Sequence, residues 1–141
     1  MQTFLSTPTS LYILKKGEEL MTQLEVVARE QNLSSAWVNI IGGASAVTLG
    51  YYNPEAREYQ WTDFNEPLEI LGLSGNLAIV DGKPMWHIHG TFGRADSSVL
   101  GGHVRSCTIG LTGEIALTPI DAKLTRTYDG ETGLNLLTEA K

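Results

Sequence analysis

The alternation of apolar and polar positions predicts a chain made mostly of β-strands, with one helix near the N-terminus. The run "SLYILKKG", Ser10 to Gly17, is rich in strand-forming residues and predicts a first strand. A helix is predicted over about residues 17–31, because apolar residues recur there every three or four positions and form one stripe. The stripe consists of Leu20, Met21, Leu24, Val27 and Ala28.

Polar residues indicate the ends of this helix. We expect Glu18 and Glu19 in its first turn, where the helix dipole stabilises anions. Asn32 is a residue type that often ends a helix, so the helix is expected to stop there.

Strand patterns return after the helix and continue to the end of the chain. The segment "SAWVNIIGGASAVTLGYYN" is apolar and β-branched, and Gly42 and Gly43 within it mark a bulge or bend. Turn-forming segments at 53–58 and 81–84 separate the strand runs. We therefore predict the α+β fold class: a mostly antiparallel β-sheet with one main α-helix, about residues 17–31, packed on it.

Composition supports a single hydrophobic core. The chain has 141 residues, of which 42% are hydrophobic and 18% charged, so we treat residues 1–141 as one domain. The chain has 15 glycines, many of them inside strand patterns. They indicate a strongly curved sheet or close contacts between subunits.

The charge balance argues against nucleic acid as a direct partner. Acidic residues outnumber basic ones 16 to 10, which gives a net charge of −6 with histidine neutral. This charge repels phosphate backbones, and no run of Lys and Arg offsets it. The N-terminus lacks a signal-peptide pattern, and no apolar run approaches the roughly 20 residues of a membrane span. A cytoplasmic protein without a membrane partner is expected.

Four further side chains are assigned to packing or turns. The single cysteine, Cys107, excludes an intrachain disulfide and is expected to be a small buried residue in the strand pattern "VRSCTIG". Trp61 and Trp86 are interpreted as core or interface aromatics. Asp96, in "GRADSS", is expected to stabilise a turn.

All three histidines of the chain lie in "MWHIHGTFGRADSSVLGGHV", residues 85–104. His87 and His89 are two residues apart in a predicted strand, so they point to one face while Ile88 points to the core. His103 follows 14 residues after His89 (103 − 89), beyond a glycine-rich loop. This length lets the chain turn and bring the next strand alongside.

Two interpretations of the histidine cluster stay open. Three neutral imidazoles with an open fourth position are typical of a catalytic zinc site, although copper, nickel or cobalt could also bind. The other interpretation is a polar pocket of hydrogen-bonded histidines. Glu114, in "LTGEIAL", could orient a ligand histidine or accept a proton from metal-bound water; otherwise it is a solvated strand residue.

Several motifs, in their order and spacing, resemble the PPC domain (plants and prokaryotes conserved). The matching segments are "LEILGLSGNLA", "HIHGTFGRADSSVLGGHV" and "GEIAL", and the upstream "IIGGASAVTLGYYN" fits the family's glycine-bearing strand. The resemblance covers nearly the whole chain, from about "YILKKGEEL" to "LNLL". It implies a compact α+β domain with an antiparallel sheet and a helix, assembled as a homotrimer.

The resemblance also implies a ligand set. In prokaryotic members the H-x-H pair and the histidine of "GGH" are associated with a bound divalent metal, usually taken as zinc, and they match His87, His89 and His103 here. The family is often labelled DNA-binding, because plant relatives carry an AT-hook before the domain. The Arg-Gly-Arg-Pro core of an AT-hook is absent from this sequence, so direct DNA binding is not expected.

The sequence therefore supports a stand-alone PPC-domain protein, homotrimeric, that binds zinc or another divalent metal. The open coordination position suggests an enzyme, but no further motif indicates a reaction, so enzymatic activity stays an open question. The alternative is a regulatory or assembly module that acts through protein partners, with the metal serving stability.

Overall fold

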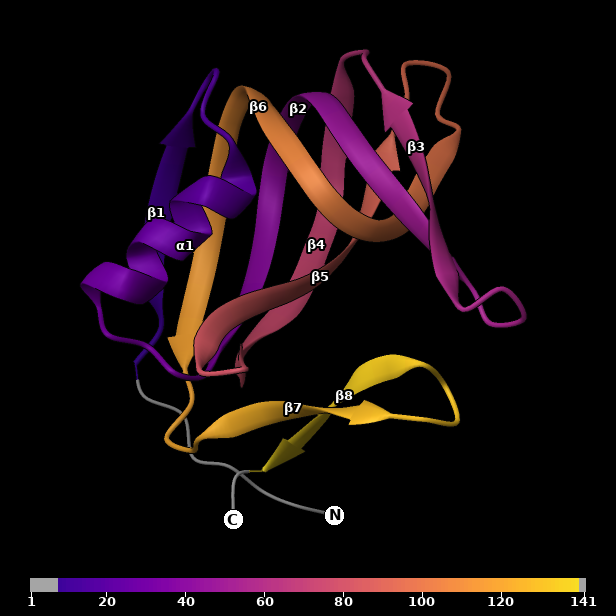
Figure 1. Ribbon diagram of the computed structural model, residues 1–141. Helices are drawn as coiled ribbons and strands as arrows, with labels where there is room; N and C mark the ends of the chain where they lie inside the picture. The colour runs from indigo at the N-terminus through magenta and orange to yellow at the C-terminus, as the bar shows by residue number, and fades with distance from the viewer. Residues whose placement is uncertain (1–7, 140–141) are drawn as a thin grey trace.

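The computed structural model describes residues 8–139, which form eight strands and one helix (Figure 1). The predicted helix is confirmed, with slightly narrower bounds. In chain order the elements are β1 (Ser10–Lys15), α1 (Leu20–Glu30), β2 (Ala36–Asn53), β3 (Glu58–Phe64), β4 (Leu68–Val80), β5 (Lys83–Gly93), β6 (Val99–Pro119), β7 (Leu124–Asp129) and β8 (Leu134–Glu139).

Four of the strands close into a ring of antiparallel pairs. β2 pairs with β6, β6 with β5, β5 with β4, and β4 pairs again with β2. The ring closes because the long strand β2 changes partner along its length: residues 36–44 pair with β4, whereas residues 47–53 pair with β3. The result is the barrel-like wall in Figure 1, with β1 added beside β6. The predicted antiparallel sheet is confirmed.

The bend predicted at Gly42 and Gly43 lies where β2 curves. The register of β2 shifts between Ile40 and Gly42, and again between Gly42 and Ala44. Gly42 has a φ of +147°, and a Cβ at this position would collide with the carbonyl oxygen of Thr112 on β6. Only glycine therefore allows the two long strands to approach this closely.

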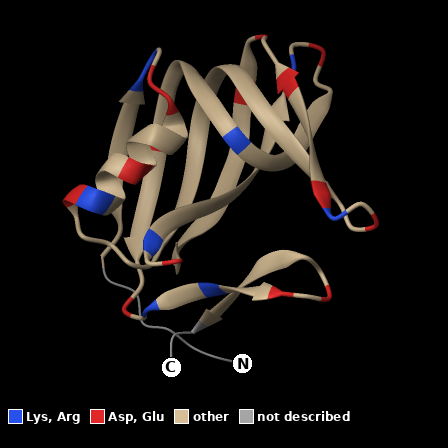
Figure 2. Ribbon diagram, in the orientation of Figure 1, with Lys and Arg blue, Asp and Glu red and all other residues tan. Residues whose placement is uncertain are grey.

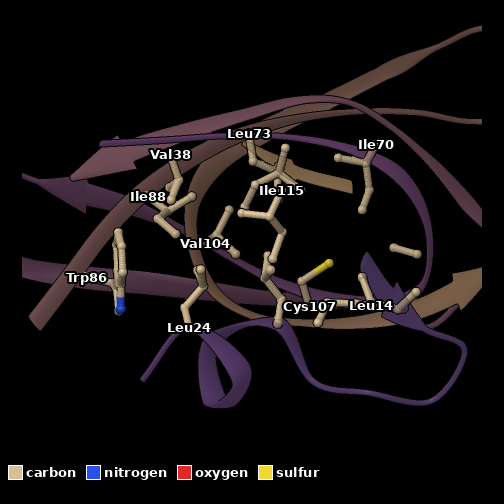
Figure 3. Close-up of a cluster of buried hydrophobic side chains, with 14 of the residues drawn as sticks. Leu14, Leu24, Val38, Ile70, Leu73, Trp86, Ile88, Val104, Cys107 and Ile115 are labelled. Carbon is tan, nitrogen blue, oxygen red and sulfur yellow. The ribbon is translucent and has the colours of Figure 1, made fainter. Parts of the chain in front are cut away.

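Apolar side chains fill the inside of the ring (Figure 3). Ile88 and Phe92 of β5 are fully buried, and Trp86 is 6% exposed, so its predicted core position is confirmed. Cys107 is also fully buried, as predicted, and burial raises the pKa of its thiol to about 12. Truncation of a core side chain such as Phe92 to alanine would cost about 3–5 kcal/mol.

Helix α1 packs against β5 and β6 with its predicted stripe inward. The predicted position of Glu18 and Glu19 in its first turn is wrong, because the helix begins at Leu20 and Glu19 is the N-cap in an extended conformation. From there the Glu19 carboxylate reaches the backbone N–H groups of Met21 and Thr22. No helix within residues 8–139 is long and apolar enough to span a membrane.

The hairpin of β7 and β8 lies beside the barrel and joins the sheet through one parallel pair, Ile79 with Thr125 (Figure 1). A second contact holds its tip: the Tyr52 hydroxyl donates to the carbonyl oxygen of Thr132 at 2.8 Å. The segment does extend the sheet, as predicted. Its main consequence is that β7 runs beside β4, the neighbour of the histidine-bearing strand β5.

Candidate metal centre

Strand β5 presents His87 and His89 on the outer face of the barrel. Its residues alternate, so Trp86 and Ile88 are buried in the core while the two histidines point away from it. The turn Asp81–Gly82 sets where this alternation begins. Both turn residues have positive φ angles, +49° and +78°, which is the hairpin turn that the sequence predicted.

Strand β6 returns beside β5 and places His103 directly opposite His89. Opposed residues of an antiparallel pair share one face, so all three histidines lie on the outer face. The chain reverses at residues 94–98, where the Asp96 carboxylate accepts hydrogen bonds from the backbone N–H and hydroxyl of Ser98, at 2.9 and 2.6 Å. The predicted turn role of Asp96 is confirmed.

The three imidazoles are in mutual contact. Nε2 of His87 lies 3.1 Å from Nε2 of His89. The His103 ring centroid is 5.0 Å from that of His87 and 5.3 Å from that of His89. One ligand nitrogen from each ring lies within 4.8 Å of the other two. The structure therefore brings together all three predicted metal ligands.

This arrangement fits a tetrahedral metal. Zinc–nitrogen bonds of 2.0–2.1 Å place two ligand nitrogens about 3.3 Å apart. The His87–His89 separation of 3.1 Å is close to this value, and the ligand nitrogen of His103 lies within 4.8 Å of both. Nδ1 of His103 is buried and has no hydrogen-bond partner among residues 8–139. A buried unpaired nitrogen costs about 1–3 kcal/mol, which coordination to a metal would offset.

Electrostatics keeps two of these rings in the form that binds metals. Burial, followed by repulsion from Arg126, His103 and His89, lowers the pKa of His87 to about 4. Burial, followed by repulsion from His89 and Arg126, lowers the pKa of His103 to about 4. Both rings are therefore neutral at pH 7, the protonation state in which an imidazole binds a metal.

Aromatic side chains of β3 form one wall of the site. The ring centroids of Tyr59 and Trp61 lie 5.0 and 5.8 Å from that of His103. Both rings lie over Gly50 of β2, where a Cβ would overlap them, and Gly50 is the β2 residue that pairs with His103. Trp61 was predicted to be a core or interface aromatic. It is 38% exposed and packs at this site.

Sequence reasoning missed Arg126 of β7. Its Nη2 donates to Oδ1 of Asn76 at 2.8 Å and contacts Nδ1 of His87 at 2.9 Å, and its Nη1 donates to the Asn135 carbonyl oxygen at 3.1 Å. Arg126 follows His103 by 23 residues (126 − 103), and no local motif connects the two. Only the position of the hairpin places this cation beside the histidines.

Glu114 lies elsewhere on the outer face. It is 11 residues beyond His103 on β6 (114 − 103), opposite Ile41 of β2 and Ile13 of β1. There it lines an apolar groove together with Leu11. The group of side chains that could hold a metal does not include it, so its suggested role in orienting a ligand or moving a proton stays a prediction.

Comparisons with known proteins give the chain a family and several close folds. The model of the Plants and Prokaryotes Conserved (PCC) domain matches residues 3–121. The metal-containing protein of Archaeoglobus fulgidus is 35% identical, with a TM-score of 0.91, and the match covers 99% of this chain and 100% of that one. A plant- and prokaryote-conserved (PPC) protein of Pyrococcus horikoshii is 29% identical, with a TM-score of 0.91 and coverage of 100% and 98%.

A third structure carries a different label. A protein of Bacteroides thetaiotaomicron, named as a DNA-binding candidate, is 27% identical, with a TM-score of 0.89 and coverage of 98% and 99%. None of the curated proteins matches the chain. The family model ends before β7, whereas the similar structures extend over the hairpin as well. On the strength of the family match and the shared fold, this chain belongs to the Plants and Prokaryotes Conserved domain family.

Proposed function

We propose that this protein binds a divalent metal, in the first place zinc, through His87, His89 and His103. The convergence of three imidazole nitrogens within 4.8 Å carries the proposal. The name of the Archaeoglobus protein, which describes it as metal-containing, supports it. Three neutral imidazoles are a ligand set that suits zinc and leaves one tetrahedral position for a further ligand.

The residues around the cluster set what a bound ion could do. Zinc supplies a Lewis acid that polarises a carbonyl or lowers the pKa of water. Tyr59 and Trp61 shield the cluster on the β3 side, while His89 is exposed and leaves an approach from solvent. The open coordination position makes the centre a candidate for hydrolytic or carbonyl chemistry. A screen for hydrolytic activity is the direct way to identify the reaction.

Metal content per chain tests the proposal. Wild type, His89→Ala and Thr91→Ala are purified without an affinity tag and analysed for metals. His89 and Thr91 are both exposed on the same face of β5, so Thr91→Ala is the matched control. We expect about one zinc per chain in wild type and control, and at least a tenfold loss in His89→Ala. Wild type that takes up no metal after zinc addition would contradict the proposal.

We also propose that the protein assembles as a homotrimer, as its family resemblance implies. The support is an apolar patch on the outer face of the sheet, with side chains that a lone monomer would leave in water. Leu11 is 68% exposed and Ile41 is 55% exposed, and both line the groove beside Glu114. The patch comprises Leu11, Ile13 and Ile41 around Glu114. Trp37, Leu71 and Leu111 are further exposed apolar side chains of β2, β4 and β6.

Sedimentation or light scattering of the wild type tests the assembly. We expect a mass of three chains for wild type and a smaller mass for Ile41→Glu, because a charge at the centre of an apolar contact is costly to bury. Leu137→Glu, on the exposed hairpin strand β8, is the matched control and should keep the wild-type mass. A monomeric wild type, or an unchanged mass in Ile41→Glu, would contradict the assembly.

A second candidate function is a regulatory or assembly module that acts through protein partners. The same apolar patch favours it, and the metal would then serve stability. An oligomer that stays folded and intact after chelation would count against a structural metal. Direct DNA binding is not proposed: the net charge is −6, and Figure 2 shows Lys and Arg spread over separate elements among Asp and Glu.

A further inference from the structure

Arg126 is a partly buried cation without a carboxylate partner among residues 8–139. The ion pair found in this part of the chain joins Arg94 to Glu66. The side-chain acceptors that Arg126 reaches, Asn76 and His87, are neutral. Its own Nε is buried, and none of the described residues accepts a hydrogen bond from it. Buried cations are normally paired, so this guanidinium is poised for an anion.

The contact between Arg126 and His87 fixes where the His87 proton lies. Arginine has only donors, so Nδ1 of His87, 2.9 Å from Nη2, must be the acceptor. The proton of the neutral His87 ring is therefore on Nε2, where it can be donated to Nε2 of His89 at 3.1 Å. The three side chains form a directed chain of hydrogen bonds from Arg126 through His87 to His89.

Metal binding to His87 is incompatible with this chain of hydrogen bonds. If Nε2 of His87 binds the ion, the ring proton moves to Nδ1, which can then no longer accept from Arg126. If Nδ1 binds the ion, its lone pair is used by the metal. In both cases Arg126 loses its acceptor on His87, next to a newly bound positive charge.

We propose that metal binding releases Arg126 from His87, and that the released guanidinium and the ion together bind a small carboxylate. This inference rests on the proposed metal site. Nε and Nη2 share one edge of the planar guanidinium, and two parallel N–H groups match the two oxygens of a carboxylate. The metal-binding group contains no Asp or Glu, so an external anion is needed to offset the combined charge.

Zinc affinity in the presence of acetate tests the inference. Affinity is measured by competition with a chromophoric chelator, in acetate or in chloride at equal ionic strength, for wild type and Arg126→Met. Acetate binds the zinc-loaded form, so by linkage it tightens zinc binding to wild type. We expect Arg126→Met to weaken this acetate effect by about tenfold or more, because two charge-assisted hydrogen bonds to the carboxylate are lost. In chloride the variant should bind zinc at least as tightly as wild type, because a competing contact is gone.

Control variants distinguish the effect of the two-donor edge of the Arg126 guanidinium from the effect of its positive charge. Arg105→Met removes the same charge from β6, where the guanidinium lies 5.0 Å from the Trp61 ring centroid, and it should keep the full acetate effect. Arg126→Lys keeps the charge without the two-donor edge and should recover only part of it. If Arg126→Met does not fold, the lysine variant carries the comparison alone.

The outcomes distinguish this inference from the metal site on which it rests. An acetate effect equal in wild type, Arg126→Met and Arg126→Lys would overturn the inference and leave the metal site standing. A larger effect of sulfate than of acetate in wild type would overturn the choice of a carboxylate. Wild type that binds no zinc in any anion would contradict the metal site itself, and this inference with it.

Discussion

Two polar clusters lie four residues apart on β6 (107 − 103) and differ in how completely their hydrogen bonds are made. At Cys107, the Glu19 carboxylate accepts four hydrogen bonds of 2.7–3.1 Å, from the Cys107, Met21 and Thr22 backbone N–H groups and the Thr22 hydroxyl. At His103, Nδ1 is buried and has no hydrogen-bond partner within residues 8–139, and the same holds for Nε of the nearby Arg126.

The difference distinguishes a structural cluster from the candidate metal centre. The Glu19 cluster is complete within the chain, and it ties the start of α1 to the sheet. Burial by itself would raise the pKa of Glu19, but the hydrogen bonds from Cys107, Thr22 and Met21 outweigh it and lower that pKa. The histidine cluster has unpaired polar atoms in the part of the chain that the structure describes, which is expected where an external ligand supplies the missing partner.

The largest expected effect is the stabilisation of the histidine cluster by zinc. A ligand at 1,000 times its dissociation constant stabilises the folded state by about 4 kcal/mol. We expect zinc to raise the melting temperature of wild type by several degrees, and a chelator to reverse the shift. His89→Ala should show no shift, since it removes an exposed ligand without opening the core. Equal shifts in both proteins would place the zinc elsewhere.

A smaller effect is expected from breaking the complete cluster. Glu19→Ala removes the acceptor of four hydrogen bonds and should cost about 1–3 kcal/mol in the free energy of unfolding, measured by urea denaturation. Its zinc content should stay that of wild type. Glu25→Ala removes the same charge from an exposed position of α1 and is the control. A loss of zinc in Glu19→Ala would show that the clusters are not independent.

Acid weakens the two clusters in two successive pH ranges. The pKa values of His87 and His103 are lowered from 6.5 to about 4, so unfolding exposes groups that take up protons. In chelator-treated protein their contribution is complete above pH 6.5 and is lost as the pH falls from 6.5 to about 4. The pKa of Glu19 is lowered from 4.5, so its contribution is lost only below pH 4.5.

Urea denaturation at a series of pH values measures the free energy of unfolding across both pH ranges. With zinc in the buffer, this free energy should fall more steeply as the pH drops through the histidine range, because protons compete with the metal for the imidazoles. Glu19→Gln should reduce only the pH dependence below pH 4.5, which comes from the Glu19 carboxylate. A stability of chelator-treated wild type that does not change between pH 6.5 and 5 would contradict the neutral, partly buried state of the two histidines.

The smallest effect is expected at Glu114. The structure places this carboxylate beside Ile41 and Ile13 rather than among the histidines, so Glu114→Gln should change zinc content and zinc affinity by less than about twofold. Competition with a chromophoric chelator measures the affinity. A clear weakening would revive the role in orienting a ligand that the sequence suggested for Glu114.

Local periodicity was enough to predict the part of the site carried by one strand. His87 and His89 share a face because side chains alternate with period two, and their neighbour Ile88 had to be buried. The spacing between His89 and His103 also predicted that the next strand returns alongside, but the register that places His103 opposite His89 is seen only in the structure. The helix stripe, the turn at Asp81 and the bend at Gly42 are similarly local features.

The features that were missed depend on pairing between distant segments. Arg126 reaches His87 only because β7 runs beside β4, and Trp61 reaches His103 only because Gly50 leaves room between β3 and β6. No residue near Arg126 or Trp61 in the sequence signals these contacts. Glu19 was misplaced for a related reason: whether a residue caps a helix or enters it depends on its φ and ψ angles, and sequence spacing does not determine these.

Anomalous diffraction from crystals of wild type soaked in zinc tests the central claim most directly. The account predicts one strong peak per chain with nitrogens of His87, His89 and His103 at about 2.0–2.1 Å, and Arg126 withdrawn from His87. A peak bound by fewer than three of these histidines, or zinc bound only elsewhere on the chain, would contradict it.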